Sequence, residues 1–168
     1  MSVTVKNPLV VKDACVFFDL IDLGILDSFY QLKLSVITTP EVLDEIADAA
    51  QRQEVQGYID AGKILVDADG NFEQLVAITD AAPALSLSDA SVLDVASRRN
   101  TMILSSDKSL RKEAGVRGIS VHGMLWILEQ LHVQEVLTVE IVVEKLKKYP
   151  TVNGWTPKRE TEQLINKL

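Results

Sequence analysis

Two aspartates of this chain stand just beyond short apolar segments. Asp13 follows the apolar residues 9–11, and Asp107 follows the apolar residues 101–104 after two serines. The segment 108–112, which contains Lys108, Arg111 and Lys112, reads as the start of a helix, so helix capping is the simpler interpretation of Asp107. Capping explains Asp13 only weakly, because Asp13 lies among mostly apolar residues at the end of an expected strand.

Two further carboxylates take comparable places. Glu45 lies in the opening turns of a helix whose start is predicted by Thr39 and Pro40, since a hydroxyl N-cap followed by proline is typical of that position. Asp89 opens another helix after the connection formed by residues 84–87. Taken alone, Glu45 is more typical of an exposed helix face, and Asp89 is more typical of a cap.

The chemistry changes if a parallel sheet brings these carboxylates together. Functional groups in open parallel sheets collect beyond the carboxyl ends of the strands. Four clustered carboxylates would repel one another and raise one another's pKa values. A hard divalent cation, Mg²⁺ or Mn²⁺, removes this repulsion, and one or two such ions would activate water for attack on a phosphodiester. We therefore predict a metal site formed by Asp13, Glu45, Asp89 and Asp107.

Short apolar segments alternate with helical patterns along the whole chain. The alternation predicts an α/β fold, a three-layer α/β/α sandwich with a mostly parallel central sheet. We expect one domain over residues 1–132 and a C-terminal helical extension, residues 133–168, packed on the same domain. The expected strands are 9–11, 35–38, 63–66, 101–104 and 119–121, and the expected helices are 14–23, 25–32, 40–56, 72–78, 88–100, 108–114, 123–131, 138–148 and 158–168.

The composition narrows the class of protein. The 168 residues, 47% of them hydrophobic, suit one globular domain with a substantial core. The net charge of −7 argues against nonspecific affinity for nucleic acid, so phosphate binding would need a basic patch or a cation. One cysteine excludes an intrachain disulfide, and neither a signal-peptide core nor a membrane span is present in the sequence. A soluble, cytoplasmic protein without membrane association is expected.

The motifs around these carboxylates resemble the PIN-domain family over residues 9–131. The segment VVKDACVFFDLIDLG is similar to the family's opening strand, metal-binding aspartate and apolar helix. VITTPEVLDEI is similar to its second block, and LSLSDASVLDVASRRNTMILSSDKSLRKEA is similar to its third and fourth blocks. Carried over position by position, the resemblance implies catalytic and metal-binding roles for Asp13, Glu45, Asp89 and Asp107.

The resemblance also implies an activity. PIN-domain relatives of this kind are Mg²⁺- or Mn²⁺-dependent endoribonucleases that hydrolyse single-stranded RNA. The segment VRGISVHGMLWILEQL resembles a subgroup close to prokaryotic toxin ribonucleases of the VapC type. This implies the toxin of a type II toxin–antitoxin pair, with an antitoxin protein as partner, and a homodimer. Ser105 matches a supporting hydroxyl of the family, whereas Cys15 replaces a supporting asparagine, a change that concerns the tuning of the site more than its activity.

Basic residues near the expected site are candidates for contacts with RNA phosphates, although an exposed helix face is their simpler interpretation. They are Arg98, Arg99, Lys108, Arg111 and Lys112.

Two other interpretations stay open. The chain could be a PIN-like protein-interaction module with little or no nuclease activity, although the complete set of acids argues against this. A phosphatase that uses Asp13 as its nucleophile would need a second aspartate where Cys15 stands, so this interpretation ranks lower.

Overall fold

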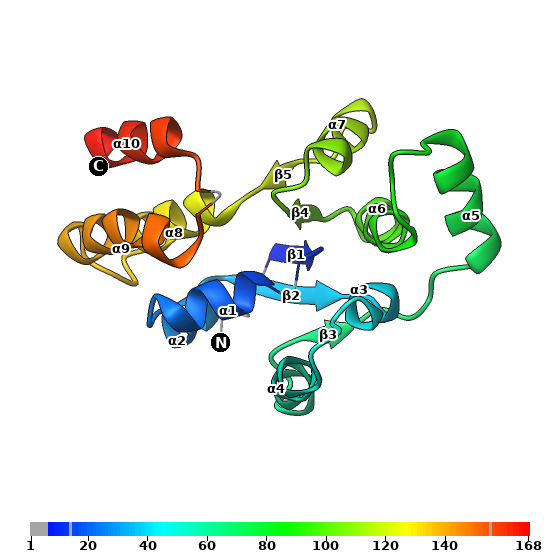
Figure 1. Ribbon diagram of the computed structural model, residues 1–168, viewed down its shortest axis with the longest axis horizontal. Helices are drawn as coiled ribbons and strands as arrows, with labels where there is room; N and C mark the ends of the chain where they lie inside the picture. The colour runs from blue at the N-terminus through cyan, green and yellow to red at the C-terminus, as the bar shows by residue number, and fades with distance from the viewer. Residues whose placement is uncertain (1–6, 14, 155) are drawn as a thin grey trace, which may run out of the picture. The chain divides into compact units, whose positions relative to one another are not determined.

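A computed structural model describes residues 7–13, 15–154 and 156–168. Its strands form a five-stranded sheet in the order β3-β2-β1-β4-β5, with every neighbouring pair parallel (Figure 1). The sheet is flanked by helices, which confirms the predicted α/β class and is consistent with a three-layer sandwich. The strands are β1 (Asn7–Val11), β2 (Leu34–Thr38), β3 (Leu65–Val66), β4 (Met102–Leu104) and β5 (Val121–His122).

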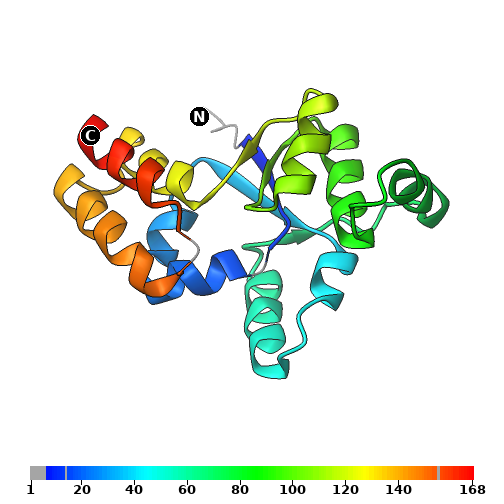
Figure 2. The ribbon, with the colours of Figure 1, turned by 45° about the horizontal axis from the view of Figure 1, so that its top comes forward.

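The central strand is apolar because both of its faces are covered. Leu9 and Val10 have no exposed surface, and Val11 is 1% exposed. Strands of a parallel sheet that are buried on both faces have continuous rather than alternating apolar sequences. Figure 2 shows β1, in dark blue, from a second direction, with β2 running beside it. The apolar runs of the sequence therefore identified β1 and its two neighbours correctly.

The described chain divides into two compact units. The first contains the sheet and residues 33–122, and the second contains residues 15–32 and 123–168. The helices of the first unit are α3 (Pro40–Asp44), α4 (Ala49–Asp60), α5 (Phe72–Ala81), α6 (Leu87–Arg99) and α7 (Lys108–Val116).

Helix α6 is the central helix of the first unit. It packs against β1, β4, α3 and α5, and its residues 88–96 are all buried. Val92 and Leu93 belong to the same apolar core cluster as Val10 of β1 and Ile103 of β4. A helix so completely buried has a fixed position relative to the strands, and its N-terminal residues are correspondingly well placed.

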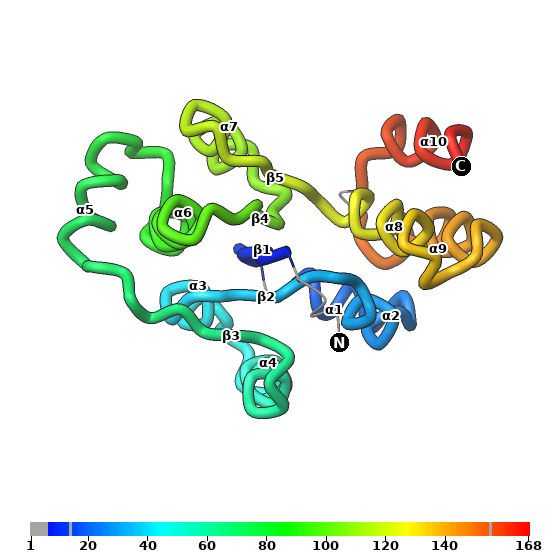
Figure 3. The backbone as a smooth tube through the Cα atoms, turned by 180° about the vertical axis from the view of Figure 1, so that it is seen from behind, coloured from blue at the N-terminus to red at the C-terminus, as the bar shows by residue number. Residues whose placement is uncertain are grey.

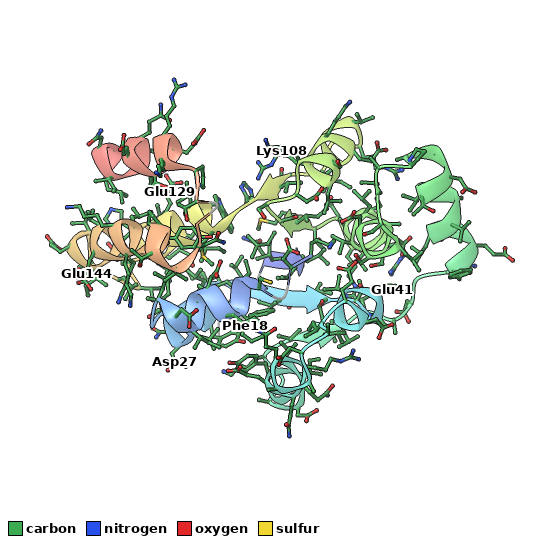
Figure 4. All side chains as sticks on the ribbon, in the orientation of Figure 1. Phe18, Asp27, Glu41, Lys108, Glu129 and Glu144 are labelled. Carbon is green, nitrogen blue, oxygen red and sulfur yellow. The ribbon has the colours of Figure 1, made fainter. Side chains whose placement is uncertain are left out.

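The second unit consists of helices from both ends of the chain (Figure 3). Phe17 and Phe29 form an edge-to-face pair with ring centroids 6.5 Å apart. Lys167 donates a hydrogen bond to Glu129, which Figure 4 labels on α8. These helices are α1 (Cys15–Asp22), α2 (Leu26–Tyr30), α8 (Met124–Val133), α9 (Val139–Val152) and α10 (Lys158–Lys167). The predicted division of the chain at residue 132 stays a prediction.

A hydrogen-bonded carboxylate joins α1 to α9 within the second unit. Asp19 Oδ2 accepts hydrogen bonds from the Tyr149 hydroxyl at 3.3 Å and from Asn153 Nδ2 at 3.2 Å. Burial raises the pKa of Asp19, and these two hydrogen bonds only partly oppose the rise. Burial, followed by the charge of Asp19, raises the pKa of the Tyr149 hydroxyl. The phenol therefore stays a neutral donor to this carboxylate.

Two predicted helix boundaries are wrong. The expected helix 40–56 is two helices, because α3 ends at Asp44 and α4 begins only after Asp48, whose side chain caps it. The expected helix 138–148 is too short, because α9 continues past Pro150 to Val152. Because the missing N–H of Pro150 falls in the last turn of α9, only one backbone hydrogen bond is lost there.

Candidate functional site

Backbone hydrogen bonds align the chain at the carboxyl ends of three neighbouring strands. Beyond β1, Lys12 N donates to Leu104 O at 3.1 Å. Beyond β4, Ser105 N donates to His122 O at 2.9 Å. Asp13 and Asp107 follow these two anchored positions, so both carboxylates lie at the same edge of the sheet.

Lys12 is the residue around which three of the predicted acids gather. Its Nζ lies 3.1 Å from Glu45 Oε2, 3.6 Å from Asp89 Oδ1 and 3.9 Å from Asp13 Oδ1. Only 10% of the Lys12 side chain is exposed. These contacts bring together carboxylates that are 32 to 76 residues apart in the chain. Lys12 was not among the predicted site residues.

Asp89 has two oxygens in different environments. Its Oδ2 accepts a hydrogen bond from Ser86 N at 2.8 Å, while Ser86 Oγ accepts from Asp89 N at 3.1 Å, which is a capping box at the start of α6. Its Oδ1 is buried and accepts no hydrogen bond. Asp89 therefore caps its helix with one oxygen and directs the other toward Lys12.

Glu45 is held from two sides. It is the C-cap residue of α3, and its Oε1 accepts a short hydrogen bond from Ser88 Oγ while Oε2 accepts one from Lys12. A hydrogen bond of 2.7 Å between two hydroxyls, Thr39 Oγ1 and Ser91 Oγ, also joins the start of α3 to α6. Ser88 also was not predicted, although its position directly before Asp89 was a usable signal.

Asp107 completes the group from the β4 side. Its Oδ1 accepts a hydrogen bond from Leu110 N at 2.7 Å and so caps α7, as expected for an aspartate at that position. The buried hydroxyl of Ser105 accepts a hydrogen bond from Asp107 N at 3.1 Å. The supporting contact expected of Ser105 is present, and its contribution to activity stays a prediction.

The charges of this cluster shift two pKa values. Burial raises the pKa of Asp13, which Lys12 opposes, and the charges of Glu45, Asp107 and Asp89 raise it further. Burial alone would lower the pKa of Lys12, but the hydrogen bond to Glu45 and the nearby carboxylates outweigh burial and raise it. All four predicted acids thus act on one another or on Lys12, which makes them one electrostatic unit.

The four predicted acids form a carboxylate cluster, and the ammonium group of Lys12 lies among them. Within the part of the chain that the structure describes, no three His, Cys, Asp or Glu side chains are grouped closely enough to hold a metal ion directly. Lys12 stands between Asp13, Glu45 and Asp89. Metal binding by these acids accordingly stays a prediction.

The predicted RNA-binding residues fall into two groups. The guanidinium groups of Arg98 and Arg99 pair with the carboxylate of Asp67, and Arg98 also pairs with Asp94. Arg111 donates to the carbonyls of Ser105 and Val121 at 3.4 Å. The arginines therefore have roles in holding the fold, whereas Lys108 and Lys112 are exposed on α7, where Figure 4 labels Lys108. RNA binding by all five stays a prediction.

Comparison with known proteins identifies the family. A family model described as PIN domain matches residues 9–168. The chain therefore belongs to the PIN-domain family, whose fold is generally that of a nuclease. The crystal structure of PAE2754 from Pyrobaculum aerophilum is similar in fold, with a TM-score of 0.53 and 15% sequence identity over 77% of this chain and 98% of that one. A search of curated proteins gave no match.

None of the described helices combines the length and the apolar character needed to cross a bilayer.

Proposed function

We propose that this chain is a Mg²⁺- or Mn²⁺-dependent endoribonuclease that hydrolyses phosphodiester bonds of single-stranded RNA. The observation that carries the proposal is the second oxygen of Asp89. This oxygen, Oδ1, is buried and accepts no hydrogen bond. It lies near the ammonium of Lys12, which the carboxylates of Asp13 and Glu45 also contact. A buried carboxylate oxygen without a hydrogen-bond donor is costly for the fold, and a cation ligand is a common reason for keeping one.

The donor types of these residues suit a hard divalent cation. The donors are carboxylate oxygens, which Mg²⁺ and Mn²⁺ prefer. The side chain of Asp89 is 8% exposed, whereas those of Asp13 and Glu45 are 40% and 47% exposed, so one ligand would be fixed and the others accessible to water and substrate. The nearby carboxylates raise the pKa of Lys12, which supports a local potential that favours cations.

The chain's own residues would hold the reacting groups in place. A bound Mg²⁺ would supply activation of water and neutralisation of phosphate charge. Asp89 is fixed by the capping box, Asp107 by the start of α7, and Glu45 by Ser88. Lys108 and Lys112 would contact phosphates on either side of the cleaved bond, which positions the strand without reading its sequence.

The same proposal extends to partners. As the toxin of a type II toxin–antitoxin pair, the chain would be restrained by an antitoxin protein and would act as a homodimer in the cytoplasm. The alternative is a protein-interaction module with little or no nuclease activity. Purified chain that binds a partner protein but cleaves no RNA with either metal would favour that alternative.

The direct test is cleavage of single-stranded RNA by the chain and by its Asp13→Asn variant, with Mg²⁺, with Mn²⁺ and with EDTA. We expect metal-dependent cleavage by the wild-type chain and a loss of at least about 100-fold in the variant, because a ligand charge is removed. Attack by water leaves 5′-phosphate and 3′-hydroxyl ends, which end-labelling distinguishes from the cyclic phosphates of a contaminating metal-independent ribonuclease.

The exposed Asp80 on α5 supplies the matched control for this test. Asp80→Asn makes the same chemical change away from the cluster and is expected to cleave at the wild-type rate. Equal rates for the wild type and Asp13→Asn would refute the proposed role of Asp13.

Replacing Ser88 with alanine tests how Glu45 is positioned. Without the Ser88 hydroxyl, Glu45 loses one of its two side-chain hydrogen bonds and should spread over several rotamers. We expect about 10-fold slower cleavage and about 10-fold weaker Mn²⁺ binding, with little change in melting temperature. Ser97→Ala, on the exposed part of the same helix, is the control. Unchanged Mn²⁺ affinity in Ser88→Ala would show that this hydrogen bond does not position the acid.

A further inference from the structure

Lys12 is an unusual residue to find inside a carboxylate cluster. Lysine is almost never fully buried unless it is paired. Here the residue is 8% exposed, and its ammonium lies within 4 Å of oxygens from Asp13, Glu45 and Asp89. Its backbone N–H is fixed to Leu104 O at the end of β4. The ammonium is therefore directed into the cluster from an anchored position on the sheet.

The pairing of Lys12 with the carboxylates offsets two unfavourable free energies, that of burying the ammonium and that of gathering the carboxylates. Burying an ammonium is expensive unless opposite charges surround it, and gathering carboxylates is expensive unless a cation separates them. Lys12 meets both conditions at once, because its ammonium hydrogen-bonds Glu45 and forms an ion pair with Asp89 Oδ1, which accepts no hydrogen bond. The cluster can consequently stay assembled without any metal.

The same position makes Lys12 a competitor for metal. A divalent cation bound by these oxygens would lie within a few ångströms of the ammonium, and two cations at about 4 Å repel strongly in a partly buried site. The carboxylate oxygens within 4 Å of Nζ are also the candidate metal ligands, so a cation bound there would compete with the ammonium for them.

We propose that Lys12 is the built-in counter-ion of this carboxylate cluster and that a divalent cation binds by displacing its ammonium. This inference rests on the metal site of the proposed function. It assigns Lys12 the role of setting metal affinity: the lysine stabilises the metal-free site and weakens metal binding by the free energy needed to move its charge. A cluster without that lysine would bind metal more tightly but would be less stable when empty.

The test compares the wild-type chain with Lys12→Met, which keeps an unbranched side chain one atom shorter and removes its charge. Isothermal titration with Mn²⁺ gives the affinity, and thermal melting in EDTA gives the stability of the empty site. We expect Lys12→Met to bind Mn²⁺ at least about 10-fold more tightly and to melt at a lower temperature in EDTA, with Mn²⁺ reversing the loss. Lys12→Gln, which keeps a donor for Glu45, is the second variant if the methionine chain does not fold.

Control and outcomes separate this inference from the proposed function. Lys147→Met, at an exposed position of α9, is expected to match the wild type in both measurements. Equal Mn²⁺ affinity in wild type and Lys12→Met would overturn displacement while leaving the metal site intact. The absence of Mn²⁺ binding in both chains would overturn the metal site and displacement together.

Discussion

Replacing Asp89 with asparagine is expected to lower the rate of metal-dependent RNA cleavage by at least about 100-fold while leaving the fold intact. The two oxygens of Asp89 explain why both effects are expected. Oδ2 accepts a hydrogen bond from Ser86 N, and an asparagine carbonyl can accept the same bond, so the cap of α6 survives. Oδ1 is the buried oxygen without a hydrogen-bond donor, and the variant removes its charge.

The measurements are the cleavage rate on single-stranded RNA with Mg²⁺ and the melting temperature in EDTA. Asp48→Asn is a matched control, because Asp48 also caps a helix, accepting from Gln51 N at 2.8 Å, and lies outside the carboxylate cluster. We expect Asp48→Asn to keep wild-type activity. An Asp89→Asn chain that cleaves RNA as fast as the control would show that Asp89 only caps α6.

Replacing Asp67 with asparagine is expected to cause the largest loss of stability, about 2–3 kcal/mol. The Asp67 side chain has no exposed surface, and its two oxygens accept hydrogen bonds from Arg98 Nη2 at 2.9 Å and from Arg99 Nε. Asparagine would remove the charge that pairs with both guanidinium groups, and only Arg98 would keep a second carboxylate, Asp94. Because these groups are about one-third exposed, water can solvate them in part, which keeps the loss below that of a fully buried pair.

The stabilisation that Asp67 gives through Arg98 and Arg99 depends on pH. Burial alone would raise the pKa of Asp67, but the hydrogen bonds from Arg98 and Arg99 lower it to about 2. A carboxylate with a lowered pKa stabilises the fold fully above its ordinary pKa of about 4, and this stabilisation is lost as the pH falls toward 2. The free-energy difference between wild type and Asp67→Asn should therefore shrink between pH 4 and pH 2.

Denaturant unfolding at pH 6 and at pH 3 measures that difference. Asp69→Asn is the control, because Asp69 is exposed and contacts Asp67 only through its backbone N–H. It should change stability by less than about 0.5 kcal/mol. An equally small change in Asp67→Asn would mean that the two arginines do not depend on this carboxylate.

The strands and several helix starts could be predicted because their signals are local. A run such as Leu9-Val10-Val11 has no reason to be uniformly apolar unless both faces are buried. Thr39, with Pro40 behind it, accepts the hydrogen bond from Val42 N that its position predicted. Asp107 likewise caps α7. In each case the sequence signal lies within four residues of the feature.

The partners of the candidate site could not be predicted, because they depend on distant residues. Lys12 meets Glu45 across 33 residues, and Ser88 meets Glu45 across 43. The helix also stops after Asp44, and its C-cap residue Glu45 is the residue whose side chain Lys12 and Ser88 hold. The position of Ser88 directly before Asp89 indicates that it lies near the site, but only packing the helices on the sheet specifies which residues pair.

The two ends of α6 are linked by the stiffness of a single buried helix. Asp89 stands in its first turn, whereas Arg98 and Arg99 fasten its last turn to Asp67. The 13 residues of α6 form a rod about 20 Å long. A rod that is clamped at its far end tolerates little positional error at its near end. The pairing of Asp67 with Arg98 and Arg99 therefore helps to fix the position of Asp89, although it lies at the other end of α6.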